Sequence, residues 1–546
     1  MLYNVIVIIF SLIISIIILR KEFNKKYEKI IEWLKVNKLV IITFVIFVVG
    51  FTVRLIGITN YPNGLNCDEA SIGYEAYSLL NYGIDRNGNS WPVFLEAWGS
   101  GQNALYMYII MPFIKILGLT KLAVRLPMAI IGCISLIGMY KILQKTKNPK
   151  IAVLGLAFFA ICPWHIMKSR YGLESNIFPD LALWGAYFYV TALENNKILK
   201  LYIGSILFGL CAYAYGTSYY FLPSFLTILF VILIIKKKIN IKQAIICLAI
   251  VFVISLPIIL MLIINTFDLE QITIWKITIP RLESNRYETL TVLSSDNIIN
   301  TLITNFKKSI KMLIFQNDGY NANTLKSYGI IYIFSLPITI IGLINCIIKR
   351  KENINLIFNI WFISAFFLTF ICEPNINRMN ILYIPLIYYT SIGIYEITQT
   401  INWSIYILLL IYIFEFISFQ INYYQTDFTQ TYTFYDNIEN VIKYSDSIQA
   451  DKIYFQYAFK EPYIYILFYN QGNTKEFVET VKYKNDTKGF DSVISFEKYI
   501  FSLPNKINEE ENAAYIMLKD KEKDYDIDET KYDKIYIDNF VVINKK

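Results

Sequence analysis

Charged side chains are scarce in this sequence. Only 17% of its 546 residues are Asp, Glu, Lys or Arg, whereas 55% are hydrophobic. Because soluble domains carry about a quarter charged residues, the composition excludes an ordinary soluble protein. Apolar runs recur along the first 420 residues, and each is long enough to cross a hydrocarbon core of about 30 Å. The sequence therefore predicts an all-α membrane protein with many spans.

Residues that build metal centres and nucleotide sites are also few. The chain has one histidine, and its seven cysteines include no CxxC pair, which argues against a zinc module. No glycine-rich phosphate loop follows a predicted strand. A nucleic-acid partner is not expected, since Lys and Arg in short loops between spans explain the net charge of +8. A divalent metal requirement stays open, because Asp68, Glu69 and Glu75 offer carboxylates without a complete ligand set.

Twelve of the apolar runs are predicted to be transmembrane helices. They cover residues 2–19, 39–58, 122–142, 151–167, 177–193, 201–215, 219–235, 243–264, 329–348, 354–371, 379–397 and 403–419. A further apolar stretch, 101–118, is predicted to lie in the outer membrane interface, because only then do the lysine-rich loops all fall on one side. That side is cytoplasmic by the positive-inside rule. Loops 59–121 and 265–328 and the chain beyond residue 420 are therefore predicted to be extracytoplasmic.

The chain changes character after the last predicted span. Residues 1–420 are expected to form a multi-span membrane domain with juxtamembrane helices, and residues 421–546 a small extracytoplasmic α/β domain. Short aromatic and β-branched segments typical of strands occur at 452–457, 514–518 and 534–543. Helical patterns occur at 435–448 and 462–471. Nothing in this segment suggests catalysis, so a lid, docking or substrate-recognition role is expected.

The predicted outer loop 59–121 opens with Asn66-Cys67-Asp68-Glu69, followed by apolar residues at helical spacing. Asp68 would lie in the first turn of a helix, where unpaired backbone N–H groups favour an anion, and capping is the simplest interpretation. The functional interpretation is a general base. Transfer of a sugar from a lipid phosphate to a hydroxyl needs one base, because the leaving phosphate is already a stable anion. A glycosidase would instead need two carboxylates at a defined separation.

Polar residues of other predicted outer segments are candidates for holding the substrate. Arg170 and Arg378 could grip the donor phosphate bidentately, although interfacial snorkelling or a local ion pair is the competing interpretation for each. Asp180 lies just inside a predicted span, where an acid is a functional candidate by default. Asp318 lies in a polar turn, and Tyr74 lies on the first predicted outer helix. Both are further candidates for the substrate site.

Two short motifs resemble those of glycosyltransferase family 39. They are the Asp68-Glu69 pair just after an early span, and Ala123-Val124-Arg125-Leu126-Pro127 before the next one. Protein O-mannosyltransferases and lipid A aminoarabinose transferases are relatives in this family, which has the GT-C fold. The order of predicted spans and loops resembles that of the family over residues 39–400. It implies an inverting transfer from a polyprenyl-phosphate sugar, with Asp68 as base, Glu69 supporting it, and Arg378 at the lipid phosphate.

The acceptor stays open, because the sequence departs from the family in two places. The tail is unlike the soluble domains of eukaryotic O-mannosyltransferases, and no histidine stands beside Arg378. Protein, lipid and glycan acceptors therefore remain. A transporter or flippase of lipid-linked saccharides should have polar groups near mid-membrane, whereas the candidates here lie at the predicted outer boundary. A glycan polymerase or ligase would need more outer arginines. A sugar transferase is the favoured function.

Overall fold

The computed structural model describes residues 37–284, 291–292, 295–320, 323–325, 328–428, 434–484, 489 and 492–546. The predicted span 2–19 lies outside these residues. The chain divides into two compact units, residues 1–49 and 50–546. Of the first unit only residues from 37 onward are described, and they form the beginning of α3 (Lys38–Leu55).

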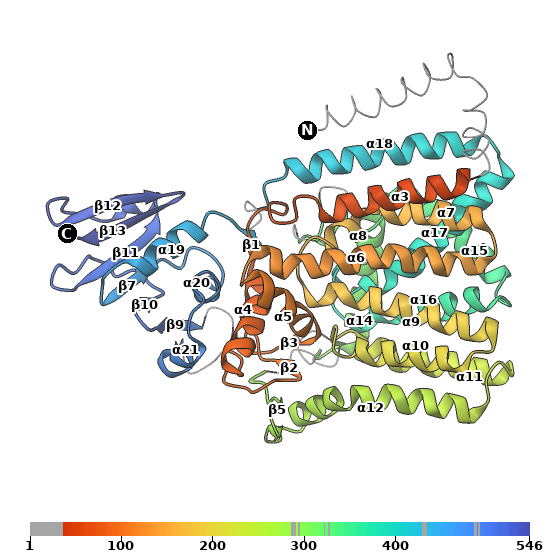
Figure 1. The fold of residues 1–546 in the computed structure, drawn as a ribbon, viewed down its shortest axis with the longest axis horizontal. Coiled ribbons are helices and arrows are strands. Elements are labelled where there is room, and N and C mark those ends of the chain that lie inside the picture. The colour runs from red at the N-terminus through yellow and green to blue at the C-terminus, as the bar shows by residue number, and fades with distance from the viewer. Residues whose placement is uncertain are drawn as a thin grey trace, which may run out of the picture. The chain divides into compact units, whose positions relative to one another are not determined.

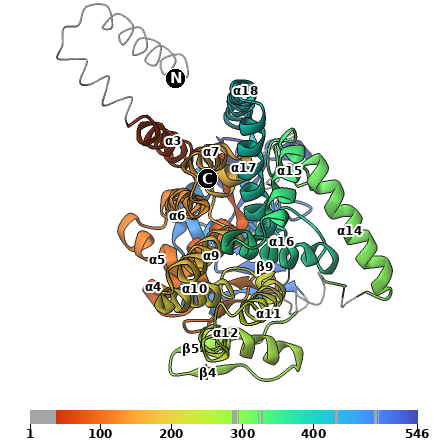
Figure 2. The ribbon, with the colours of Figure 1, turned by 90° about the vertical axis from the view of Figure 1, so that its right-hand side faces the viewer.

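Long helices make up most of the second unit as far as residue 425. They are α6 (Lys121–Leu143), α7 (Pro149–Ile161), α9 (Phe178–Asn195), α10 (Ile198–Cys211), α11 (Ser218–Ile235), α12 (Ile241–Thr266), α15 (Ser335–Ile348), α16 (Asn353–Ile371), α17 (Tyr383–Thr400) and α18 (Ser404–Gln425). Most of them run alongside one another in Figure 1 and are seen nearly end-on in Figure 2. This is the arrangement of a polytopic helical membrane protein, as predicted.

Seven of the described helices are long and apolar enough to cross a membrane on their own, namely α3, α6, α11, α12, α16, α17 and α18. Helices α7, α10 and α15 are apolar but shorter. The predicted span 151–167 is not one helix: α7 ends at Ile161, and α8 (Pro163–Lys168) follows. The break comes at Cys162, whose extended backbone is the conformation favoured before a proline. The total of twelve spans stays a prediction.

The apolar stretch 101–118 contains the short helix α5 (Leu105–Leu117). Its 13 residues rise only about 20 Å, less than the hydrocarbon core. Helix α5 packs against α4 (Cys67–Tyr82) and α6, and α4 and α5 lie together at one end of the long helices (Figure 1). This length and packing agree with a juxtamembrane helix.

A seven-stranded mixed sheet occupies most of the chain after α18. Its strands follow the order β12-β13-β11-β7-β10-β9-β8, and the central strand β7 is parallel to both of its neighbours. The bounds are β7 (Lys452–Phe455), β8 (Lys482–Tyr483), β9 (Val493–Phe496), β10 (Tyr499–Ile500), β11 (Ala513–Leu518), β12 (Tyr532–Ile537) and β13 (Phe540–Lys545). Helices α19 (Glu439–Ser447), α20 (Pro462–Asn470) and α21 (Thr474–Thr480) accompany the sheet. The C-terminal segment is therefore α/β, as predicted.

Two details of this segment differ from the prediction. The single strand predicted at 534–543 is wrong, because Asp538 adopts a positive φ of 49° and Ile537 pairs with Phe540 across a tight hairpin turn. The helix predicted from residue 435 begins at Glu439. Its first predicted residue belongs to β6 (Phe434–Tyr435), which pairs antiparallel with β1 (Leu65–Asn66).

Candidate active site

Helix α4, which carries Asp68, is capped by Asn66. The Asn66 side chain accepts a hydrogen bond from the backbone N–H of Asp68 at 2.8 Å, and Oε2 of Glu69 accepts one from the backbone N–H of Asn66 at 3.2 Å. Together they form a capping box. The interpretation of Asp68 as the helix cap is therefore wrong, because Asn66 occupies that position.

Glu69 is fully buried against Arg125 of α6. The guanidinium donates from Nε to Oε1 and from Nη2 to Oε2, each at 2.8 Å. The backbone N–H of Gly172 donates a further bond to Oε1 at 2.9 Å. The other Arg125 hydrogen bonds go to the carbonyl oxygens of Ile58, Pro62 and Gly64. Both carboxylate oxygens are thus occupied, and the pair fixes the start of α4 to α6.

Asp68 has different surroundings from its neighbour. It is only partly buried, and its Oδ1 accepts a hydrogen bond from Nε1 of Trp98 at 2.9 Å. Within the described ranges its Oδ2 has no hydrogen bond or ion pair. The Cζ atom of Arg86 lies over the Trp98 ring, 4.8 Å from the ring centroid. The Trp98 and Tyr463 rings meet edge to face, with their centroids 6.2 Å apart. One carboxylate oxygen is therefore held in place and the other is available to a substrate.

A second buried ion pair holds the loop after α4. Arg86 lies 3.2 Å from Oε1 of Glu75, and its backbone N–H donates to Oε2 of Glu75 at 2.9 Å. The nearby Asp85 is fully buried, and burial, reinforced by the charge of Glu75, raises the pKa of Asp85 to about 8. Glu75, which the sequence offered as a metal ligand, is the partner of Arg86.

The structure places Tyr74 at the contact between α4 and the C-terminal segment. Its hydroxyl donates to the carbonyl oxygen of Gly472 at 3.0 Å and lies 3.0 Å from the Thr474 hydroxyl. The Thr474 hydroxyl is also 2.6 Å from the hydroxyl of Ser78. Tyr74 thus joins α4 to the segment around α21 through hydrogen bonds.

Arg170 is fully buried. Its guanidinium donates to the carbonyl oxygens of Val53 at 2.7 Å and Ile56 at 2.9 Å, and it stacks on the rings of Tyr423 and Tyr424. These contacts tie the end of α3 to the segment after α8. A side chain held in this way is poorly placed to reach a lipid phosphate.

Asp180 belongs to a buried polar cluster near the start of α9. It accepts a hydrogen bond from Nζ of Lys168 at 2.5 Å, and its Oδ1 lies 3.3 Å from Nε2 of His165. Nδ1 of His165 is 2.8 Å from Nη2 of Arg54. Internal partners thus surround Asp180, which is 2% exposed, as buried ionised groups require.

Arg378 lies between two cavities. One is lined by Asn103, Glu174, Thr217, Tyr220 and Arg378 among others. The other is lined by Lys308, Lys311, Asp318, Tyr320, Glu373 and Arg378 among others. The Arg378 guanidinium donates to the carbonyl oxygen of Glu373 at 2.9 Å, and its carboxylate partner, also Glu373, is 55% exposed. Arg378 is therefore a cation within reach of ligands.

Asp318 organises the loop that carries Arg378. Its Oδ2 accepts hydrogen bonds from the Asn323 side chain at 2.7 Å and from the backbone N–H of Ile376 at 2.8 Å. It thereby joins the turn after α14 (Ile298–Phe315) to the loop between α16 and α17, which contains Ile376 and Arg378. Lys308 and Lys311 of α14 were not predicted as site residues. Their spacing of three on one helical face was the available signal.

The described part of the chain contains no group of three or more His, Cys, Asp or Glu side chains arranged to hold a metal ion. Glu69 and Glu75 each face an arginine. The carboxylates that the sequence offered to a divalent ion therefore do not form a ligand set.

A sequence model of the family described as dolichyl-phosphate-mannose-protein mannosyltransferase matches residues 103–262. No curated protein sequence matches the chain. Among solved structures, ArnT from Cupriavidus metallidurans bound to undecaprenyl phosphate aligns with a TM-score of 0.56 at 8% identity, covering 93% of this chain and 98% of that chain. Its apo state aligns with a TM-score of 0.53 at 10% identity. The chain has the GT-C fold.

The archaeal oligosaccharyltransferase from Archaeoglobus fulgidus is also similar, at 12% identity with a TM-score of 0.49. The match covers 79% of this chain but only 61% of that chain, so this chain accounts for less than two thirds of that enzyme's length. The family match confirms the predicted resemblance to the protein O-mannosyltransferase family, and the likeness to ArnT confirms the fold. Together they support a membrane glycosyltransferase of the GT-C type.

Proposed function

We propose that this protein transfers a sugar, with inversion, from a polyprenyl-phosphate donor to an acceptor hydroxyl at the extracytoplasmic face. The matched family is described by a dolichyl-phosphate-mannose donor, and one ArnT structure holds undecaprenyl phosphate. Both lipids are polyprenyl phosphates. The observation that carries the proposal is the contrast at the start of α4, where Glu69 is saturated by partners and Asp68 keeps one oxygen available.

In this mechanism Asp68 is the general base. Its Oδ2 takes the proton of the acceptor hydroxyl while that oxygen attacks the anomeric carbon of the sugar. The bond from the anomeric carbon to the phosphate oxygen breaks, and the polyprenyl phosphate leaves with the electron pair. The leaving group is a stable anion, so no second carboxylate is needed as an acid. Trp98 holds Oδ1 of Asp68, and Glu69 supports the helix start through Arg125.

The donor head group is proposed to lie in the cavity beside Arg378. Arginine can bind phosphate through two parallel hydrogen bonds, and Lys308 and Lys311 add positive charge on the other side of Arg378. Asn103, Glu174 and Tyr220 offer polar groups and an aromatic face to the sugar. The buried hydroxyl of Thr217, in the same cavity, has no hydrogen-bond partner among the described residues. An unsatisfied buried polar atom in a cavity wall is a sign of a missing ligand.

A hydrogen-bonded segment connects this cavity with Glu69, the neighbour of the proposed base. Glu174 accepts from the Gln102 side chain at 2.9 Å, and Gly172, two residues earlier, donates to Glu69 at 2.9 Å. Segment 172–174 thus reaches both the cavity and the helix turn that carries Asp68. The acceptor, a protein, lipid or glycan hydroxyl, is proposed to approach Asp68 from the solvent side.

The test is a transfer assay on the purified chain in lipid nanodiscs. Polyprenyl-phosphate sugars with a labelled sugar are supplied with cell-envelope acceptors, and incorporation of label is measured. Wild type is expected to transfer label, and Asp68→Asn to lower the rate by about a hundredfold or more with donor binding retained. Asp520→Asn, at an exposed acid of the C-terminal segment, is the matched control. Transfer at the wild-type rate by Asp68→Asn contradicts the assignment of the base. Movement of lipid-linked sugar across liposomes without transfer would indicate a flippase.

A further inference from the structure

The C-terminal segment packs directly on the helix that carries Asp68. Helix α20 lies against α4, and the hydroxyl of Tyr465 in α20 donates to the carbonyl oxygen of Leu65 at 3.1 Å. Strand β6 pairs with β1, placing Phe434 opposite Asn66, the cap of α4. The first turn of α4 is therefore fixed by residues more than 350 positions later in the chain.

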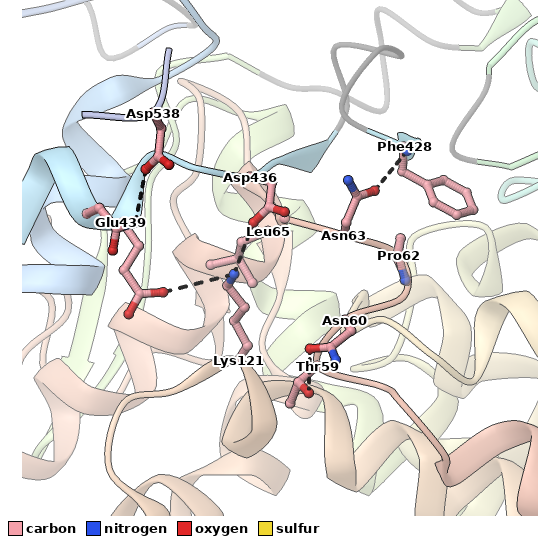
Figure 3. Close-up of polar contacts among 12 residues, drawn as sticks. Thr59, Asn60, Pro62, Asn63, Leu65, Lys121, Phe428, Asp436, Glu439 and Asp538 are labelled. Carbon is pink, nitrogen blue, oxygen red and sulfur yellow. Dashed lines mark hydrogen bonds and ion pairs between the residues drawn. The ribbon is translucent and has the colours of Figure 1, made fainter. Parts of the chain in front are cut away.

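Helix α4 packs closely at Gly73. A Cβ atom added there would lie 2.7 Å from the Phe468 ring and 2.9 Å from Val124 of α6. In Figure 3 the Lys121 side chain, at the start of α6, extends toward Asp436 and Glu439. The ion-pair distances are 3.6 and 4.0 Å. The segment thus binds α4 and α6 together.

Further contacts hold the chain just before α4. The side-chain oxygen of Asn63 accepts a hydrogen bond from the backbone N–H of Phe428 at 2.8 Å (Figure 3). Gly64 follows with a positive φ of 78°, and a Cβ there would lie 2.4 Å from the backbone of Tyr435. Only glycine allows this approach. Docking of the C-terminal segment therefore begins before the helix that carries Asp68.

Trp98 connects this interface to Asp68. It has a positive φ of 56°, which is strained for a residue with a bulky side chain and persists only when its surroundings hold it. Its indole is 7% exposed. Arg86 lies over one part of the ring and Tyr463 of α20 meets it edge-on, while Tyr463 itself stacks on Phe477 at 5.9 Å. The indole N–H is thereby aimed at Oδ1 of Asp68.

We propose that the C-terminal segment positions the general base, with Tyr463 holding Trp98 and Trp98 holding Asp68. This inference rests on the proposed function, since it assigns a role to neighbours of the proposed base. Trp98 and Tyr463 are positioning residues, because neither need touch the substrate. A change in how the C-terminal segment docks would then reach Asp68 without any rearrangement of the long helices.

The Trp98 N–H fixes the orientation of the Asp68 carboxylate, because it donates to Oδ1 at 2.9 Å. Removing that donor lets the carboxylate rotate away from the acceptor hydroxyl. The catalytic step should therefore slow while donor binding is kept.

The test compares full-length variants in the nanodisc transfer assay. Trp98→Phe keeps an aromatic ring and removes the indole N–H that donates to Asp68. It is expected to lower kcat about tenfold, with the donor KM unchanged. Tyr463→Ala should lower kcat by less, and Tyr463→Phe, which keeps the ring, should leave kcat unchanged. The double variant Trp98→Phe/Tyr463→Ala should be no worse than Trp98→Phe, because the two residues act in series.

Two outcomes would overturn the inference while leaving the proposed function intact. In one, Asp68→Asn is inactive but Trp98→Phe and Tyr463→Ala keep the wild-type kcat. In the other, these variants have a lower melting temperature and a lower yield, but their kcat per folded molecule is unchanged. That result would show that Trp98 and Tyr463 have a purely structural role. An active Asp68→Asn variant would instead refute the proposed function itself.

Discussion

Helix α6 and the loop before α17 hold their arginines, Arg125 and Arg378, in contrasting ways. Arg125, which anchors the start of α4, is fully buried and saturated by Glu69 and backbone carbonyls. Arg378 is 15% exposed, and its acidic partner Glu373 is 55% exposed. A buried pair is costly to break from one side, whereas an exposed pair contributes at most about 1 kcal/mol and exchanges partners easily. Arg125 thus holds the structure of this site, because its N–H groups all donate within the protein. Arg378 can still bind a ligand.

The same contrast separates the two adjacent acids of α4. Glu69 has the surroundings of a structural group and Asp68 those of a reactive one, although the sequence shows them only as a pair. Arg170 belongs with Arg125, since both of its terminal nitrogens, Nη1 and Nη2, donate to backbone carbonyls. The predicted site residues therefore fall into a framework class and an accessible class.

The largest effect is expected from Arg125→Ala. This change leaves the Glu69 carboxylate buried without its partner and should lower the free energy of unfolding by about 3–5 kcal/mol. Thermal unfolding and yield of folded protein in detergent would measure it. Replacing both residues of the pair with methionine should recover part of the loss. A wild-type melting temperature for Arg125→Ala would show that the pair is not a framework element.

A smaller and different effect is expected from Arg378→Ala. The donor KM should rise about tenfold to a hundredfold, because a charge-assisted contact with the phosphate is lost, while the melting temperature stays near that of wild type. Arg378→Lys should fall between the two, since it keeps the charge but not the bidentate geometry. Glu373→Gln is the control, and it should leave the donor KM unchanged or lower it. Equal losses toward donor and acceptor would place Arg378 in the framework class.

A third effect concerns the pH dependence of stability, through Asp85, the buried acid of the first loop. The pKa of Asp85 is raised to about 8 by burial, so the folded protein holds a proton there that the unfolded chain releases above about pH 4. Stability should therefore fall as pH rises from about 4 toward 8 and level off above that. Asp85→Asn removes this titration, so its melting temperature should fall less than that of wild type between pH 5 and pH 8. Identical pH dependence in the two proteins would show that Asp85 is already ionised.

Local patterns in the sequence were enough to predict the helical membrane fold, a short helix within 101–118 and the start of α4 near Asp68. Asn66, rather than Asp68, is the cap, because the capping box depends on which side chain reaches back to the first free N–H groups. The sequence contains the signal, since Asn66 precedes Glu69 by three residues. The hairpin at Asp538 was missed because a turn residue can interrupt an otherwise continuous β pattern.

Partners far apart in the chain could not be predicted in this way. Glu69 meets Arg125 across 56 positions, and Tyr465 meets Leu65 across 400. No periodicity within a single element encodes such contacts. Without them a buried arginine and an accessible one look the same, which is why Arg170 stood beside Arg378 as a candidate for the phosphate. The link from Tyr463 through Trp98 to Asp68 depends on tertiary packing for the same reason.

The most direct test of the account is a paired measurement on Asp68→Asn and Glu69→Gln. Sugar transfer from a polyprenyl-phosphate donor and melting temperature would be recorded on the same preparations. The account predicts that Asp68→Asn melts like wild type and loses transfer, whereas Glu69→Gln melts at a lower temperature and keeps measurable transfer per folded molecule. The reverse pattern, an active Asp68→Asn variant beside a stable and inactive Glu69→Gln variant, would contradict it.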